Sequence, residues 1–282
     1  MYPARFGYEA PASLDEAIKL LTNGGDDAKV LAGGQSLIPL MKLRFAAPKL
    51  IVDINNLTEL AYHRADDDGT LRIGALCRHV DLERSGLLKG TQPTMAAAAP
   101  VIADPVVRNR GTLVGSLCHA DPQGDWASVV TALGGSIIAH GPAGRRAIPI
   151  GEFVTGPFGN ALAPDEIAVE ATIPPPRGTR KGGYLKLERR VGDFATVGVA
   201  IALELDGDTV RKAGIALTGV SGDASPAALA LTGRALTPET IGEAADSAAG
   251  AARPRTDHRG SAEYKRHMVH VFVTRILEGA AA

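Results

Sequence analysis

The N-terminal part of the chain alternates between a helical and an extended pattern of hydrophobic residues. In residues 13–25 (SLDEAIKLLTNGG), Ile18 and Leu21 fall on one helical face, and two glycines end the pattern. Short apolar runs at 28–33 (AKVLAG) and 50–54 (LIVDI) are typical of strands. Together these segments predict a βαβ-like unit.

The middle of the chain mixes short strand-like and helix-like runs. Residues 94–109 have a helical composition, but Pro100 and Pro105 interrupt it, because proline removes a backbone donor and its ring clashes in a helix interior. The other predicted elements are a strand at 71–76, a short helix at 79–88, a helix at 125–133 and a strand at 136–141.

The pattern changes near residue 178. The segment 172–183 (TIPPPRGTRKGG) is rich in proline and glycine, which indicates a linker or a domain edge. Two β-rich runs around an Asp-Gly turn follow at 196–220 and predict a hairpin. Helices are predicted at 237–252, with Thr237 as N-cap, and at 261–279. The fold class is therefore α+β, with a boundary near residue 178.

Composition narrows the class of protein. Hydrophobic residues make up 45% of the chain and charged residues 22%, and the net charge of −1 gives no reason to expect nucleic acid as a partner. No apolar run reaches the length of about 18 residues that a membrane span needs, and the N-terminus lacks a signal-peptide pattern. Two cysteines are too few for an iron–sulphur cluster or a structural zinc site. Cys118 and His119 are adjacent, but two ligands do not make a metal site, so structural roles are favoured for both. We expect a cytoplasmic enzyme or enzyme subunit.

Two glycine-containing segments are candidates for a ligand site. AGGQS at 32–36 follows a predicted strand and precedes an apolar, helix-like run, and RNRGTLVGSLCHADPQGDW at 108–126 contains Gly111 and Gly115. Successive backbone N–H groups in such loops form a receptor for phosphate oxygens, so two loops could hold a dinucleotide. Neither is a Walker loop or a G-x-G-x-x-G motif. From the residues alone, structural turns stay an open alternative.

Four blocks in order carry a resemblance to a known family: AGGQSLIPLMKLR, LIVDINNLTEL, RNRGTLVGSLCHADPQGDW and KLERRVGDFATVGVA. They resemble the FAD-binding medium subunit of molybdenum hydroxylases, the flavoprotein of the carbon monoxide dehydrogenase and xanthine dehydrogenase family. The resemblance implies an FAD-binding domain at 1–177, with subdomains at about 1–56 and 57–177. A C-terminal flavoprotein domain of antiparallel strands and helices would occupy 178–282.

The resemblance also implies which residues bind the cofactor. The first diphosphate loop would comprise Ala32, Gly33, Gly34, Gln35 and Ser36, and the second Thr112, Leu113, Val114, Gly115 and Ser116. Further contacts would come from Asp125, Leu162, Lys186 and Phe194. Val114 stands where the family usually has glycine, and a β-branched residue would fit poorly if that position needed a positive φ.

For three of these residues, an ordinary structural role is an alternative to cofactor binding. Asp125 could be a helix N-cap, since aspartate is a preferred N-cap residue. Lys186 could be a solvated strand residue, as most lysines are, and Phe194 could belong to the core. These alternatives stay open from the sequence.

The resemblance implies a division of labour among three subunits. A large molybdopterin subunit would oxidise the substrate, and a small subunit with [2Fe–2S] clusters would relay electrons to the FAD of this chain. The FAD would pass them to an external acceptor, within a dimer of heterotrimers. No catalytic residue and no metal ligand is expected on this chain. The alternatives are a free-standing FAD oxidoreductase and a scaffold subunit that has lost FAD.

Overall fold

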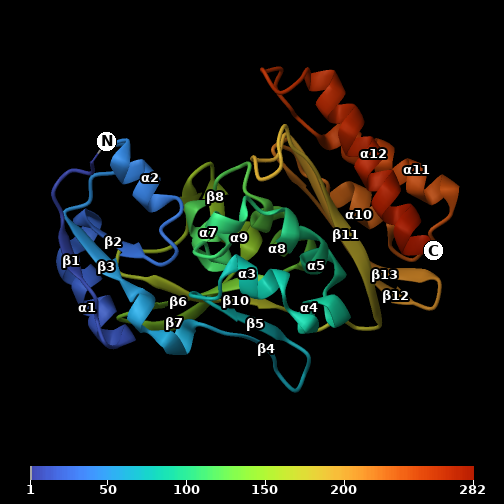
Figure 1. Cartoon of the computed structure of the whole chain (residues 1–282). Helices are drawn as coiled ribbons and strands as arrows, with labels where there is room; N and C mark the ends of the chain where they lie inside the picture. Colours follow the sequence, from blue (N-terminus) through green and yellow to red (C-terminus); the bar gives the residue numbers. More distant parts are fainter. Residues whose placement is uncertain (1) are drawn as a thin grey trace.

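A computed structural model describes residues 2–282 (Figure 1). A small N-terminal sheet lies at one end of the molecule and three C-terminal helices lie at the other, with a central sheet and its helices between them. The α+β class is confirmed, since antiparallel sheets and helices are both present. Within residues 2–282, no helix is both long enough and apolar enough to cross a membrane.

The N-terminal sheet contains three parallel strands in the order β1-β3-β2. Helix α1 begins after Ser13, whose hydroxyl accepts a hydrogen bond from the Glu16 N–H, and it buries Ile18 and Leu21. The βαβ-like unit is confirmed, because helix α2 connects parallel β2 and β3. The bounds are β1 Gly7–Glu9, α1 Leu14–Gly24, β2 Ala28–Leu31, α2 Leu37–Lys42 and β3 Leu50–Asp53.

The central sheet is antiparallel and has the strand order β4-β5-β10-β6-β7. Strand β10 comes latest in sequence but pairs with both β5 and β6. The sequence patterns did not identify β10, and its residues are buried on both faces. The bounds are β4 His63–Ala65, β5 Leu71–Gly74, β6 Ser136–Gly141, β7 Gly144–Pro149 and β10 Ile167–Ile173.

Short helices pack beside the central sheet. The single helix predicted at 79–88 is wrong in one respect, because two helices form there with a break at Ser85, which caps the second. The predicted interruption at Pro100 and Pro105 is confirmed. The bounds are α3 His79–Glu83, α4 Gly86–Thr91, α5 Pro93–Ala98, α6 Pro105–Arg108, α7 Leu113–His119, α8 Asp125–Leu133 and α9 Ile150–Phe153, with a small hairpin of β8 Val154–Gly156 and β9 Gly159–Asn160.

The C-terminal part consists of a three-stranded antiparallel sheet and three helices. The predicted hairpin around Gly207 is confirmed, and so is the helix that Thr237 caps. The linker predicted at 172–183 is shorter than expected, because its first residues end β10 and its last residues begin β11. The bounds are β11 Thr179–Leu187, β12 Val197–Asp206, β13 Thr209–Thr218, α10 Ser225–Leu231, α11 Pro238–Ala251 and α12 Ala262–Ala281.

Strand β12 is buried along almost its whole length, because both faces of its sheet are covered. Helices α5 and α8 pack on one face, and α10 and α12 pack on the other. Val199 and Ile201 share a core with Phe272 and Ile276 of α12, while Ala200 joins the core of the N-terminal and central sheets. The two halves of the chain are therefore packed against each other through this sheet.

Candidate functional site

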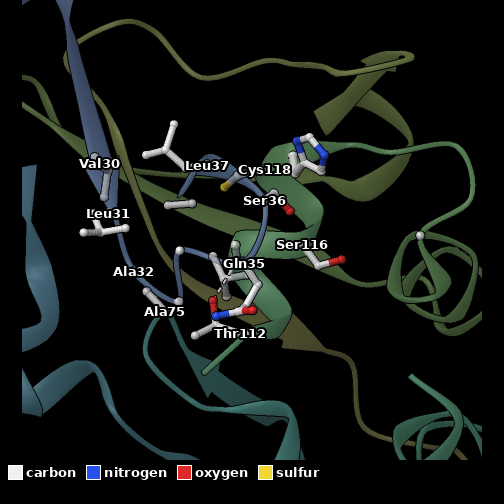
Figure 2. A pocket seen from close by; sticks show the side chains of 18 of the residues that line it. Val30, Leu31, Ala32, Gln35, Ser36, Leu37, Ala75, Thr112, Ser116 and Cys118 are labelled. Carbon is white, nitrogen blue, oxygen red and sulfur yellow. Dashed lines mark hydrogen bonds between the residues drawn. The ribbon is translucent and has the colours of Figure 1, made fainter. Parts of the chain in front are cut away.

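A cavity of about 760 Å³ lies where the N-terminal sheet, the start of α7 and the end of β11 meet. Its wall combines residues that are far apart in sequence. Figure 2 shows Gln35 and Ser36 on the first loop, with Thr112, Ser116 and Cys118 on the α7 side of the same cavity. The predicted site residues in its lining are Ala32, Gly33, Gly34, Gln35, Ser36, Thr112, Val114, Gly115, Ser116, Asp125, Leu162, Lys186 and Phe194.

The first loop, residues 32–36, connects β2 to α2. Within residues 2–282, no protein acceptor is found for the backbone N–H groups of Gly33, Gly34, Gln35 and Ser36. Gly34 has a φ of +74°, a conformation that glycine adopts without the penalty a side chain would bring. The loop therefore presents consecutive free donors at the cavity wall, which suits an anionic oxygen-rich ligand.

The two glycine segments touch each other through their backbones. A Cβ atom on Gly33 would lie 2.4 Å from the Arg110 carbonyl oxygen and 2.8 Å from the Gly111 Cα. No side chain fits at position 33 unless the two segments move apart. The close approach explains why glycine occurs at position 33.

The second segment is a helix start rather than an open loop. Thr112 is the N-cap of α7, and its Oγ1 accepts a hydrogen bond of 3.1 Å from the Gly115 N–H. Val114 has a helical backbone and is buried, so the concern about a positive φ at this position was wrong. The Leu113 side chain is fully buried in the core and does not line the cavity.

Asp125 lies at the inner end of the cavity, where its carboxylate is 7% exposed. Its Oδ1 accepts a hydrogen bond of 2.6 Å from the Tyr184 hydroxyl, and its Oδ2 accepts one of 3.1 Å from Lys186 Nζ. Burial raises the pKa of Asp125, although the Lys186 ammonium opposes that shift. The N-cap alternative was wrong, because Gly124 is the N-cap of α8 and Asp125 is its first residue.

Lys186 brings a positive charge to the same place. Its side chain is only 2% exposed, so the alternative of a solvated strand residue was wrong. The ammonium donates a 3.0 Å hydrogen bond to the Val101 carbonyl and also lies 3.4 Å from Glu188 Oε2. A buried lysine with two carboxylates in contact forms a compact charge cluster beside the cavity.

Two apolar side chains line the cavity away from the glycine segments. Phe194 is 50% exposed, so the alternative of a core position was wrong. Its carbonyl accepts a 2.8 Å hydrogen bond from Arg259, which ties the loop between β11 and β12 to the segment that precedes α12. Leu162 is half-buried, and its N–H donates to Asn160 Oδ1. Such surfaces suit contact with a planar aromatic group.

His79 is a cavity residue that the sequence analysis missed, and no local pattern marks it. Its ring is buried, and its Nδ1 accepts a 3.0 Å hydrogen bond from the Trp126 indole N–H, which leaves the ring proton on Nε2. Burial, followed by the charges of Arg108 and Arg78, lowers the pKa of His79 to about 4. A Cβ on Gly111 would lie 2.8 Å from this ring, so the imidazole backs the second segment.

Cys118 and His119 also lie at the cavity. Burial raises the pKa of the Cys118 thiol to about 12, which keeps the thiol protonated. The His119 ring packs against the Phe158 ring, with 5.3 Å between the ring centroids. Among residues 2–282, no group of three or more His, Cys, Asp and Glu side chains has an arrangement that could hold a metal ion.

Two family profiles match the chain. Residues 4–176 match the FAD binding domain in molybdopterin dehydrogenase, and residues 183–280 match the CO dehydrogenase flavoprotein C-terminal domain.

The chain is similar to known proteins along its full length. It is 41% identical over 289 residues to the carbon monoxide dehydrogenase medium chain of Hydrogenophaga pseudoflava, covering 100% of this chain and 99% of the relative. It is 36% identical to the glyceraldehyde dehydrogenase medium chain of Sulfolobus acidocaldarius, with complete coverage of both (100% and 100%). A solved carbon monoxide dehydrogenase from H. pseudoflava, which lacks the Mo-pyranopterin moiety, superposes with a TM-score of 0.94 at 42% identity, over 99% of this chain and 98% of that one.

Proposed function

Because the chain belongs to the family of FAD-binding medium subunits of molybdenum hydroxylases, we propose that it is the electron-transfer subunit of such an enzyme. Its partners are a large molybdopterin subunit and a small [2Fe–2S] subunit, assembled as a dimer of heterotrimers in the cytoplasm. The FAD-binding part comprises residues 1–177 and the C-terminal part 178–282.

The observation that carries this proposal is the pair of glycine segments meeting at one cavity. The first supplies free N–H groups, and the contact of Gly33 with Gly111 keeps the second beside it. Hydroxyls of Ser36 and Ser116 add donors at the cavity wall. This donor set fits a diphosphate, and the apolar wall fits the ring system of FAD.

Each group of residues has a distinct task in this proposal. The first loop and the start of α7 bind the diphosphate, while Leu162 and Phe194 cover the ring system and exclude water. Asp125 and Lys186 orient the end of the bound FAD that lies deepest in the cavity, and they set the electrostatic potential there. FAD, when bound, supplies the redox chemistry by taking up electrons and releasing them to an acceptor. Substrate oxidation takes place on the molybdopterin subunit, so no catalytic side chain is assigned to this chain.

Val114 gives no support to the alternative of a scaffold that has lost FAD. Its helical position needs no glycine, and its buried side chain packs in the core below the cavity. A free-standing oxidoreductase would share the cofactor but not the partners. The two functions therefore differ in which chains and chromophores accompany this one.

Purification of the complex from its own cell at natural expression tests the proposal. We expect stoichiometric FAD, identified after release, together with iron–sulphur absorbance from two co-purifying chains. FAD with no other chain or chromophore would instead indicate a free-standing oxidoreductase. Absence of flavin, even after FAD is added, would overturn the assignment of the cavity.

A further inference from the structure

Glu188 is a charged residue beside the proposed cofactor site that does not itself line the cavity. It follows Lys186 by two positions and lies one residue beyond the end of β11, where its carboxylate reaches the Lys186 ammonium. Glu188 Oε2 is buried, accepts no hydrogen bond from any group in residues 2–282, and lies 3.4 Å from Lys186 Nζ.

The charges around Lys186 do not balance. The ammonium contacts two carboxylates, Asp125 at 3.1 Å and Glu188 at 3.4 Å. Within residues 2–282, no second cation lies in ion-pair distance of either carboxylate. Asp125 is also bound by the Tyr184 hydroxyl, whereas Glu188 has Lys186 as its one ion-pair partner. The Glu188 carboxylate thus adds negative charge that the cluster does not neutralise.

This charge acts in a poorly solvated region. The Lys186 side chain is 2% exposed and that of Glu188 is 20% exposed. Charges in such a region interact more strongly than they would in water. Arrival of electrons makes a bound flavin more negative, and a nearby carboxylate opposes that change.

We propose that Glu188 is a positioning residue that, through Lys186, lowers the reduction potential of FAD bound in the cavity. The carboxylate weakens the positive field of the ammonium and thereby favours onward transfer of electrons to the acceptor. This inference rests on the proposed function in FAD-dependent electron transfer, and it names a residue that sets the reduction potential of the bound FAD.

The test is the midpoint potential of FAD bound to the full chain, measured by spectroelectrochemical titration. Glu188→Gln keeps the shape and removes the charge, so we expect a more positive midpoint potential with FAD still bound stoichiometrically. Glu188→Asp keeps the charge and should stay closer to the wild-type potential. Asp208→Asn is the matched control, since it removes one negative charge from the exposed turn between β12 and β13.

A Glu188→Gln shift no larger than that of Asp208→Asn, or a shift to a more negative potential, would overturn the inference. Should the Gln variant fail to fold, Glu188→Thr also removes the charge, suits a strand end and carries the same test. Failure of the proposed function looks different, because the wild-type chain would then bind no FAD, and the inference would fall with it.

Discussion

Acidification should destabilise the protein through His79. The pKa of this histidine falls from 6.5 to about 4 on folding, chiefly through burial and secondly through Arg108 and Arg78. A lowered pKa means that the unfolded chain binds the proton first. The contribution of His79 is therefore fully present above pH 6.5 and is lost as the pH falls towards 4. At about 1.4 kcal/mol per pKa unit, the total is about 3 kcal/mol, of which about 2 kcal/mol is lost by pH 5.

His79→Asn isolates this contribution, because the Asn Oδ1 can still accept from the Trp126 indole N–H but the amide does not titrate. Urea unfolding of both proteins at pH 8, 6 and 5, at equal cofactor content, gives the free energy of unfolding. We expect the wild type to lose about 2 kcal/mol more than the variant between pH 8 and pH 5. The exposed His258→Asn should behave like the wild type. Parallel pH profiles for wild type and His79→Asn would refute the reasoning.

Three further outcomes follow from the site. Gly33→Ala should weaken FAD binding about tenfold or more in a fluorescence titration, because the added Cβ forces the two glycine segments apart. Gly242→Ala is the control and should bind FAD normally, since a Cβ there meets no atom within 4 Å. Tyr184→Phe leaves the buried Asp125 without one donor and should cost about 1–3 kcal/mol in urea unfolding; an unchanged stability would contradict this. Phe194→Ala should change stability by about 0.5 kcal/mol or less, since the ring is half-exposed, yet alter the absorbance of bound flavin.

Elements with strong local signals could be predicted from the sequence. Thr237 caps its helix as expected, and the turn at Gly207 joins two long strands. Each signal depends on residues within a few positions of one another, so the local chain determines the outcome. The glycine segment at 32–36 was also identified as a loop between a strand and a helix.

Features that depend on distant residues could not be predicted in this way. The glycines at 111 and 115 suggested a loop, but the Thr112 cap and the buried faces of Leu113 and Val114 make a helix. Asp125 and Lys186 are 61 residues apart, and only the packing of α8 against the C-terminal sheet brings them together. The resemblance of the chain to a known family implied that both residues contact the cofactor. Their burial and their hydrogen-bond partners could be found only from the tertiary structure.

The late position of β10 has a consequence for how the protein is made. The ribosome releases β5 and β6 long before Ile167–Ile173, the strand that must lie between them. Until then, the emerging chain carries two apolar strands with unpaired edges, which are templates for aggregation. The N-terminal sheet, in contrast, is complete once Asp53 has emerged. Translation of the stretch between Gly141 and Ile173 is therefore the interval in which β5 and β6 lack the strand that pairs with both of them.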